Sequence, residues 1–526
     1  MKIRLLAPAE LQHALHDGKE IALLDVREDG EFGEDHLLFA TPLPYSRLEL
    51  GIAPLVPRKN VRIVLCDDGA SGVAQRAAAR LAAIGYSDLS VLDGGTRGWK
   101  AAGYPLFKGV NVPSKLFGEL VEHAYNTPRI TARDLVKMRE SGEDFALFDG
   151  RPVHEHHKMT IPGSTCCPNA ELPYRIASMV KNPKTKIIVN CAGRTRSILG
   201  AQTLINFGVP NPVYALENGT QGWYLSDLQL EYGSARQYPE QVDTAALPAQ
   251  QQAARALMQR FGVRTVAADE VAAWLKDDTR TTYLCDVRTP EEFAAGTIPG
   301  AQHTPGGQLI QATDQWVGVR NARIVLIDGG EAVRAPVVAS WLLQLGCEAH
   351  VLEGGVGAGL AASPPANPPL PAIPAISAAE LDAMLKRGAC TAFDVGASMA
   401  YRKAHVPGSR WSIRTRIAQD AEGAPPPIVL IGDADVARLA ATELLDAGIR
   451  DLRLFEGGAA AWEKAGLSVE ASPEIPADRE CIDYLFFVHD RHAGNREAMK
   501  QYLAWETGLM AQLGEQDKSV FRLPAH

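Results

Sequence analysis

Short apolar runs rich in β-branched residues alternate along the chain with longer stretches of helical periodicity. The runs ALLDVR, ALFDGR, YLCDVR and TAFDVG are nearly continuous in apolar residues up to an aspartate, which is typical of strands buried inside a parallel sheet. Stretches such as VAQRAAARLAAIG place apolar residues at helical spacing and predict amphipathic helices. Strands that alternate with helices predict an α/β fold in which helices cover both faces of a parallel sheet.

The same three segments recur four times in the same order. The aspartates of the first segment are followed by a second apolar run (RIVLCDDG, KIIVNCAG, RIVLIDGG, PIVLIGDA) and by a third (VLDGGTRGW, ALENGTQGW, VLEGGVGAG, LFEGGAAAW). Such internal repetition predicts tandem copies of one domain. We place the four repeats at residues 1–108, 128–233, 262–361 and 375–472, followed by a helical extension over 473–526.

The segments between the repeats differ in character. Residues 109–127 and 234–261 have partly helical patterns, whereas residues 362–374 are proline-rich and predict an extended linker. The C-terminal extension has a helical pattern around Arg496–Gly514. We expect this helix to pack on the fourth repeat.

Composition narrows the function classes. The chain of 526 residues is 46% hydrophobic and 22% charged with a formal net charge of −9, which favours a globular protein over a general nucleic-acid binder. No segment resembles a signal peptide or a membrane span. The eight cysteines are scattered and show no paired CxxC motifs, so we expect free thiols in a reducing cytoplasm and no zinc site.

The second repeat carries the most specific motifs. It contains Asp149-Gly150-Arg151, then Glu155, then IPGS at 161–164 and CAGRTRS at 191–197. These motifs resemble the rhodanese homology domain, and the arrangement is similar to the four-repeat rhodanese-related sulfurtransferases of bacteria. The resemblance extends over all four repeats. It implies four tandem rhodanese-like domains, with the catalytic cysteine in the second.

Cys191 has the sequence surroundings of a reactive thiol. It ends an apolar strand and precedes a helix, so the backbone N–H groups of the turn and the helix N-terminus can stabilise a thiolate. Gly193 eases the turn, and Arg194 and Arg196 are expected to add positive charge. We therefore predict Cys191 as the nucleophile. The residues predicted to bind substrate are Ala192, Gly193, Arg194, Thr195, Arg196 and Ser197.

The resemblance implies a two-step sulfur transfer. Cys191 takes sulfane sulfur from thiosulfate as a persulfide and passes it to cyanide or a thiol, without a metal or organic cofactor. The expected partners are this small anionic donor and its acceptor, with no nucleic acid and no membrane; homodimerisation stays open. Alternatives are a sulfurtransferase that uses 3-mercaptopyruvate or a partner persulfide, and a non-catalytic redox-sensing scaffold. The related phosphatases have five residues between cysteine and arginine, whereas four separate Cys191 from Arg196, which favours sulfur over phosphate.

The other repeats have altered motifs. Cys66 follows Asp25 by 41 residues, much as Cys191 follows Asp149 by 42, so we align Cys66 with Cys191. The neighbouring acids oppose a thiolate at Cys66, and we expect repeat 1 to be weak or inactive. In repeats 3 and 4 this alignment puts Ile327 and Ile431 at the cysteine position. This predicts inactive domains used in packing, in dimerisation or in shaping the approach to Cys191.

One further motif recurs where no cysteine is present. The set Asp149, Arg151 and Glu155 of repeat 2 has counterparts in repeat 3. We therefore interpret this set as a structural salt-bridge network.

Overall fold

The computed structural model describes residues 3–366, 368–489 and 494–524, and it contains four parallel sheets with helices packed against them. Repeats 1, 2 and 3 have five-stranded sheets of one common order, β1-β5-β4-β2-β3 in repeat 1, while the described sheet of repeat 4 has the order β17-β16-β18-β19. The predicted α/β architecture of four tandem units is confirmed. Nearly all central-strand residues are buried, because helices cover both sides of each sheet.

The elements follow one plan in each repeat. Repeat 1 contains β1 (Arg4–Leu6), α1 (Pro8–Leu15), β2 (Ala22–Asp25), α2 (Asp29–Glu34), β3 (Thr41–Pro42), α3 (Leu48–Leu55), β4 (Ile63–Cys66), α4 (Val73–Ala83), β5 (Leu89–Leu92) and α5 (Gly95–Ala101). Repeat 2 contains β6 (Arg129–Ile130), α7 (Ala132–Glu140), β7 (Phe145–Asp149), α8 (Val153–Lys158), β8 (Thr165–Cys166), α9 (Leu172–Met179), β9 (Lys186–Asn190), α10 (Thr195–Phe207), β10 (Val213–Leu216) and α11 (Gly219–Leu225).

The second half of the chain repeats this plan. Repeat 3 contains β11 (Arg264–Val266), α13 (Ala268–Trp274), β12 (Thr282–Asp286), α14 (Pro290–Ala295), β13 (Gln302–His303), α15 (Gly306–Gln311), β14 (Arg323–Ile327), α16 (Arg334–Gln344) and β15 (Glu348–Leu352). Repeat 4 contains α17 (Ala378–Lys386), β16 (Thr391–Asp394), α18 (Ser398–Lys403), β17 (Arg410–Trp411), α19 (Ile417–Asp420), β18 (Ile428–Gly432), α20 (Ala434–Asp446), β19 (Leu452–Glu456) and α21 (Gly458–Lys464).

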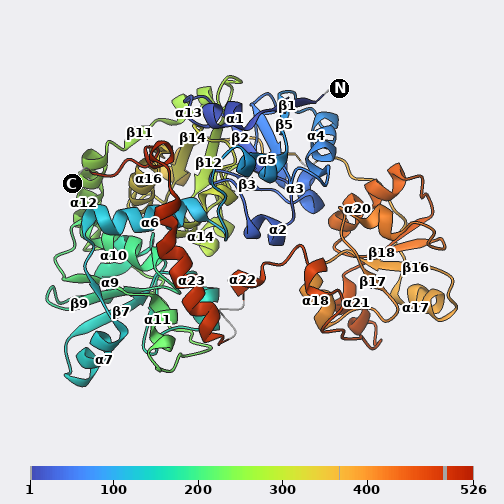
Figure 1. Ribbon diagram of the computed structural model, residues 1–526. Coiled ribbons are helices and arrows are strands. Elements are labelled where there is room, and N and C mark those ends of the chain that lie inside the picture. The colour runs from blue at the N-terminus through green and yellow to red at the C-terminus, as the bar shows by residue number, and fades with distance from the viewer. Residues whose placement is uncertain (1–2, 367, 490–493, 525–526) are drawn as a thin grey trace.

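Two long helices connect the first three repeats. Helix α6 (Val112–Tyr125) links repeat 1 to repeat 2, and α12 (Leu247–Phe261) links repeat 2 to repeat 3. One apolar cluster runs through all three repeats and both helices, including Leu65, Phe117, Leu199, Leu257 and Trp341. These three repeats therefore share a core, whereas repeat 4 has clusters of its own and lies to one side (Figure 1).

The strand register corrects the alignment of the repeats. Asp149 pairs with Asn190 in repeat 2, and the equivalent Asp25 of repeat 1 pairs with Cys66. Cys66 therefore occupies the position of Asn190, and the residue that matches Cys191 is Asp67. The alignment of Cys66 with Cys191 was wrong by one residue, because the sequence interval does not show where the strand ends.

The same register changes the assignments in the last two repeats. Ile327 pairs with Asp286, and Ile431 pairs with Asp394. Both isoleucines therefore also match Asn190. The residues at the cysteine position are Asp328 and Gly432, not the isoleucines expected from the sequence.

The C-terminal extension does not end on repeat 4. Its helices are α22 (Phe486–His489), α23 (Arg496–Gly508) and α24 (Glu515–Lys518). Figure 1 shows α23 crossing beside α6 and α11, so the extension returns to the first three repeats. The expectation that this helix packs on the fourth repeat was wrong, because its apolar and polar partners lie in α6 and repeat 2.

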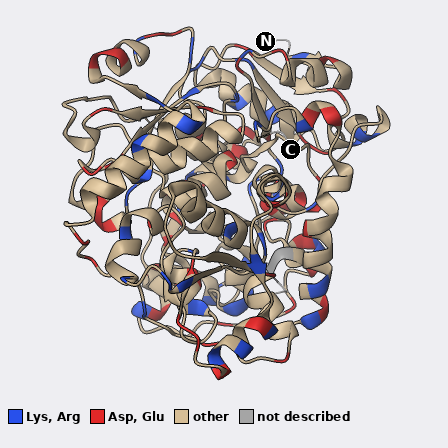
Figure 2. Ribbon diagram, turned by 90° about the vertical axis from the view of Figure 1, so that its left-hand side faces the viewer, with Lys and Arg blue, Asp and Glu red and all other residues tan. Residues whose placement is uncertain are grey.

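The charged residues show no strong segregation. Figure 2 shows basic and acidic positions interspersed over helices and loops in that view, in keeping with the modest net charge of −9. In the described part of the chain, no helix combines the length and the apolar character that crossing a bilayer requires.

Repeat 4 is joined to repeat 1 through a buried arginine. Arg414 donates to Glu49 at 2.8 Å, to Glu443 at 3.2 Å and to the Tyr45 carbonyl at 3.0 Å. Its side chain is only 1% exposed. Two buried carboxylates, Glu49 of repeat 1 and Glu443 of repeat 4, thus share this cation, and Glu443 also binds Arg80 of repeat 1 at 2.9 Å.

We expect Arg414→Ala to lower the free energy of unfolding by about 3–5 kcal/mol, because it leaves the buried Glu49 carboxylate without its cation, while Glu443 keeps Arg80. Urea unfolding followed by circular dichroism measures this loss. Arg410→Ala is the control, since Arg410 is exposed and its replacement should change stability by less than about 0.5 kcal/mol. Equal stability of the two variants would contradict the role of Arg414.

Candidate active site

Cys191 lies at the carboxyl end of β9, in a loop whose carbonyl groups are held outward. The Cys191 carbonyl accepts from the Thr220 N–H at 2.8 Å, and the Ala192 carbonyl accepts from the N–H and side-chain amide of Gln221, both at 3.1 Å. A Cβ on Gly219 would lie 2.1 Å from the Cys191 carbonyl oxygen, so only glycine permits this approach. The start of α11 thus supports the loop from outside.

The backbone N–H groups of the loop are left for a ligand. Among the described residues, no acceptor is found for the N–H groups of residues 192–196. The Ser197 hydroxyl donates to the Cys191 sulfur at 3.1 Å. Helix α10 begins at Thr195, so its N-terminus adds to this positive field. The arrangement suits a thiolate or another anion.

Arg196 is held by a carboxylate of α8. Its guanidinium donates to both oxygens of Glu155, at 2.7 and 2.9 Å. Burial raises the pKa of the Glu155 carboxyl, but Arg196 outweighs this effect and holds that pKa below its usual range. Burial lowers the pKa of Arg196, but Glu155 and then Cys191 raise it well above its usual value. Glu155 thus fixes the position of Arg196 beside the sulfur.

Arg194 turns away from the loop toward α6. Its guanidinium donates to both oxygens of Glu119 at 2.7 and 2.8 Å, and to Glu122 at 2.5 Å. The sequence led us to expect free positive charge from Arg194 and Arg196, but each is neutralised by a carboxylate. The Arg194 side chain therefore fastens the loop to α6. Only the backbone N–H of Arg194 remains available to a ligand.

The remaining predicted residues of the site line the same loop. Thr195 donates from its hydroxyl to Glu506 of α23 at 2.8 Å. The Arg196 carbonyl accepts from the Asn169 side-chain amide at 2.8 Å. The structure thus brings all seven predicted residues, Cys191 to Ser197, into one turn. Cys191 itself is only 2% exposed.

Comparison with known protein families agrees with the four-repeat architecture. The rhodanese-like domain family matches residues 7–102, 131–226, 267–362 and 377–465. The chain belongs to the rhodanese-like domain family.

Individual relatives cover the chain to different extents. A crystal structure of thiosulfate sulfurtransferase from Pseudomonas aeruginosa is 41% identical, covers 99% of both chains and has a TM-score of 0.92. An uncharacterized protein of Synechocystis sp. is 32% identical over 115 residues, which span 22% of this chain and 62% of that protein. A rhodanese-like domain from Anabaena sp. is 24% identical over 20% of this chain and 86% of its own, with a TM-score of 0.18. The family and the full-length similarity support sulfurtransferase activity.

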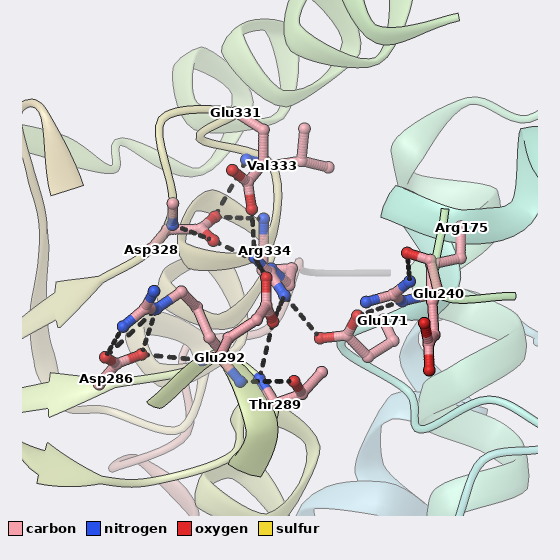
Figure 3. A network of polar contacts seen from close by, with 12 residues as sticks. Glu171, Arg175, Glu240, Asp286, Thr289, Glu292, Asp328, Glu331, Val333 and Arg334 are labelled. Atoms are coloured by element: carbon pink, nitrogen blue, oxygen red, sulfur yellow. Dashed lines mark hydrogen bonds and ion pairs between the residues drawn. The ribbon is translucent and has the colours of Figure 1, made fainter. Parts of the chain in front are cut away.

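The third rhodanese-like repeat fills its own loop with a carboxylate. Asp328, at the cysteine position, accepts from the N–H groups of Val333, Arg334 and Ala335 at 3.1, 2.8 and 3.0 Å. Arg334 also binds both oxygens of Glu292, as Arg196 binds Glu155 (Figure 3). The loop of this repeat therefore holds a built-in anion in place of a thiolate.

The first rhodanese-like repeat has a similar arrangement. Asp67 accepts from the N–H groups of Gly69 and Ala74 at 2.8 and 3.0 Å, and from the Ser71 hydroxyl at 3.2 Å. Cys66 points into the apolar core beneath the loop. Burial, followed by Asp25, raises the pKa of the Cys66 thiol well above its usual value. Cys66 is therefore placed as a core residue.

Sequence analysis missed several residues that shape the site. Glu155 was assigned to a structural network; Asp149 and Arg151 do form a buried pair at 2.6 Å, but Glu155 binds Arg196. The available signal was that Glu155 recurs as Glu292 in repeat 3, where the loop also contains an arginine, Arg334. For Asp67, the signal was that Cys66 follows Asp25 by 41 residues whereas Cys191 follows Asp149 by 42. Glu506 lies 311 residues from Thr195, and no local pattern marks it.

The loop also depends on close contact with α6. A Cβ on Gly118 would lie 2.8 Å from the Thr195 Cγ2 and 3.1 Å from its Cα. We expect Gly118→Ala to lower the free energy of unfolding by about 1–3 kcal/mol through this overlap, although alanine normally stabilises a helix. Urea unfolding is the measurement, with Gly508→Ala of α23 as control, where the site is open. A stabilised Gly118→Ala protein would show that α6 does not press on the loop.

The Glu155–Arg196 pair predicts a pH dependence of stability. The folded pKa of Glu155 is depressed, so its contribution is complete above the unfolded value of about 4.3 and is lost as the pH falls through the folded value. Glu155→Gln should lower the free energy of unfolding by about 1–3 kcal/mol at pH 7, and the difference should shrink below about pH 4. Glu140→Gln, at an exposed position, is the control. A deficit that stays constant with pH would exclude the ionised pair.

Proposed function

We propose that the protein is a thiosulfate sulfurtransferase in which Cys191 carries the sulfur. The observation that carries this proposal is the loop of residues 191–197, where the N–H groups of residues 192–196 have no acceptor among the described residues and the Ser197 hydroxyl donates to the Cys191 sulfur. Asp328 occupies the equivalent loop of repeat 3 as a carboxylate, which supports the preference of this loop for negative charge. The name of the full-length structural relative supports thiosulfate as the donor.

The proposed reaction has two displacement steps. The Cys191 thiolate attacks the outer sulfur of thiosulfate, a new S–S bond forms, and sulfite leaves with the electron pair of the old one. The persulfide is held by the N–H groups of residues 192–196, including that of Arg194, and by the Ser197 hydroxyl. The carbon of cyanide, or a thiolate, then attacks the outer sulfur and Cys191 leaves as a thiolate.

Each residue of the loop has a distinct proposed part. The N–H groups act as an oxyanion-hole-like cradle, whose value lies in being oriented before the reaction. Arg196, held by Glu155, lies beside the sulfur, and it stabilises negative charge there without moving. The loop encloses four residues between Cys191 and Arg196, one fewer than the five between Asp328 and Arg334. The shorter ring suits one sulfur atom better than a phosphate group.

We expect Cys191→Ser to abolish formation of thiocyanate from thiosulfate and cyanide, because the nucleophile is lost. Cys66→Ser is the matched control and should keep most of the activity, because Cys66 lies in the core and not in the anion-binding loop. Intact-mass spectrometry after incubation with thiosulfate should show one added sulfur atom in the control and none in Cys191→Ser. Near-normal turnover by the Cys191→Ser protein would refute the assignment.

A further inference from the structure

Helix α23 covers the Cys191 loop. Its buried side chains are Met499, Tyr502 and Glu506, one below another along a single face. This face lies close to Gly193 of the loop. A Cβ added to Gly193 would lie 3.0 Å from the Glu506 Oε2 and 3.6 Å from the Tyr502 ring. The C-terminal segment thus forms one wall of the site, as Figure 1 shows for α23 beside α6 and α11.

The closed arrangement gives a substrate no access to the sulfur. Cys191 is 2% exposed, and Ala192, Thr195 and Ser197 are 4%, 3% and 1% exposed. Thiosulfate must place its outer sulfur in contact with the Cys191 sulfur, and so must every acceptor. Part of the cover therefore has to move during each half of the reaction.

Helix α23 is much less buried than the neighbouring α6: three of its 13 residues are buried, against nine of 14 in α6. Helix α6 is buried within the shared core, and α11 bonds directly to the loop backbone. Helix α23 is held by Trp505, which packs on an apolar cluster, and by polar contacts: Thr195 to Glu506 at 2.8 Å, Lys115 to the Tyr502 hydroxyl at 2.6 Å, and an exposed pair of Arg496 with Asp227 at 3.0 Å. Elements with few buried apolar contacts open at low free-energy cost.

The far end of α23 is anchored. Leu509, directly after the helix, is fully buried against Phe107, Val112 and Leu116. The helix can therefore swing away from the loop while its C-terminal end stays in place.

Glu506 is the contact that joins this helix to the loop itself. Its carboxylate is 1% exposed, Oε1 accepts from the Thr195 hydroxyl, and Oε2 has no hydrogen-bond partner among the described residues. The Glu506 carboxylate also interacts electrostatically with the Arg194 guanidinium of the same loop. These contacts tie α23 to the loop, and their loss would release it.

We propose that α23 is a lid over Cys191, and that Glu506 is a positioning residue that latches the lid to Thr195. This inference rests on the proposed function for the identity of the molecules admitted. Opening lets the donor and then the acceptor reach Cys191, and closing shields the persulfide from water and from other thiols between the two steps.

The test is the rate at which iodoacetamide alkylates Cys191, followed by mass spectrometry of the Cys191 peptide. Glu506→Ala removes the latch and should raise this rate about tenfold, the equivalent of one lost hydrogen bond. Glu506→Gln keeps an oxygen that accepts from Thr195, so its rate should stay near that of the unaltered protein. Glu497→Gln, exposed on the same helix, is the matched control and should leave the rate unchanged.

The alkylation of Cys66 in the same samples separates lid opening from unfolding. Cys66 is buried at the end of β4, so its rate should not change when only the lid opens. A joint rise at Cys66 and Cys191 would overturn the lid, and so would an unchanged Cys191 rate in Glu506→Ala. Failure of Glu506→Gln to restore slow alkylation would overturn the latch.

A second variant avoids a change of charge. Tyr502→Phe keeps the ring and removes only the hydroxyl that accepts from Lys115, and it should raise the Cys191 rate by a few-fold. An unchanged rate in this variant as well would leave the lid without support. Alkylation needs no sulfur donor, so the lid can be verified even if Cys191→Ser retains turnover and the proposed function fails.

Discussion

The central constraint on this protein is the ring of backbone N–H groups formed where the middle strand of a repeat turns into a helix. Such a ring is a concentrated positive field in a buried place, and it has to face a negative group. Repeat 1 supplies Asp67 and repeat 3 supplies Asp328, and both carboxylates lie within hydrogen-bond distance of the N–H groups. Repeat 2 has Cys191 at this position, and the N–H groups of residues 192–196 have no acceptor among the described residues. Repeats 1 and 3 thus have a carboxylate where repeat 2 has a thiol, and repeat 4 has Gly432 there.

Charge around the loop of repeat 2 is balanced before any substrate arrives. Arg196 is paired with Glu155, and Arg194 with Glu119 and Glu122. These carboxylates bind the guanidinium groups and so fix the orientation of both arginine side chains. The oriented N–H dipoles of the loop and the paired Arg196 can therefore stabilise an anion without rearranging. Repeat 3 keeps the same geometry in its Arg334–Glu292 pair, which shows that this pairing belongs to the loop and does not require a cysteine.

The inactive-looking repeats contribute to the site through packing. Repeats 1 and 3 share a core with repeat 2, and Gly118 of α6 lies against the Cys191 loop. Arg334 of repeat 3 also reaches Glu171 of repeat 2 at 3.1 Å (Figure 3). The loop is therefore supported on several sides by parts of the chain far from it in sequence. Repeat 4, held to repeat 1 by Arg414, is more separate.

The sequence alone determined the four-fold repetition, the α/β class and the loop of residues 191–197, because strand and helix periodicity and a contiguous motif are local properties. It did not determine the alignment of Cys66, which depends on the pairing of Asp25 with Cys66 across two strands. It did not determine the partners of Arg194 or the contact of Glu506 with Thr195. These contacts join residues 72 to 311 positions apart, and only the packing of α6 and α23 on repeat 2 brings them together. Tertiary structure decided them because side-chain pairing over such distances leaves no periodic trace in the chain.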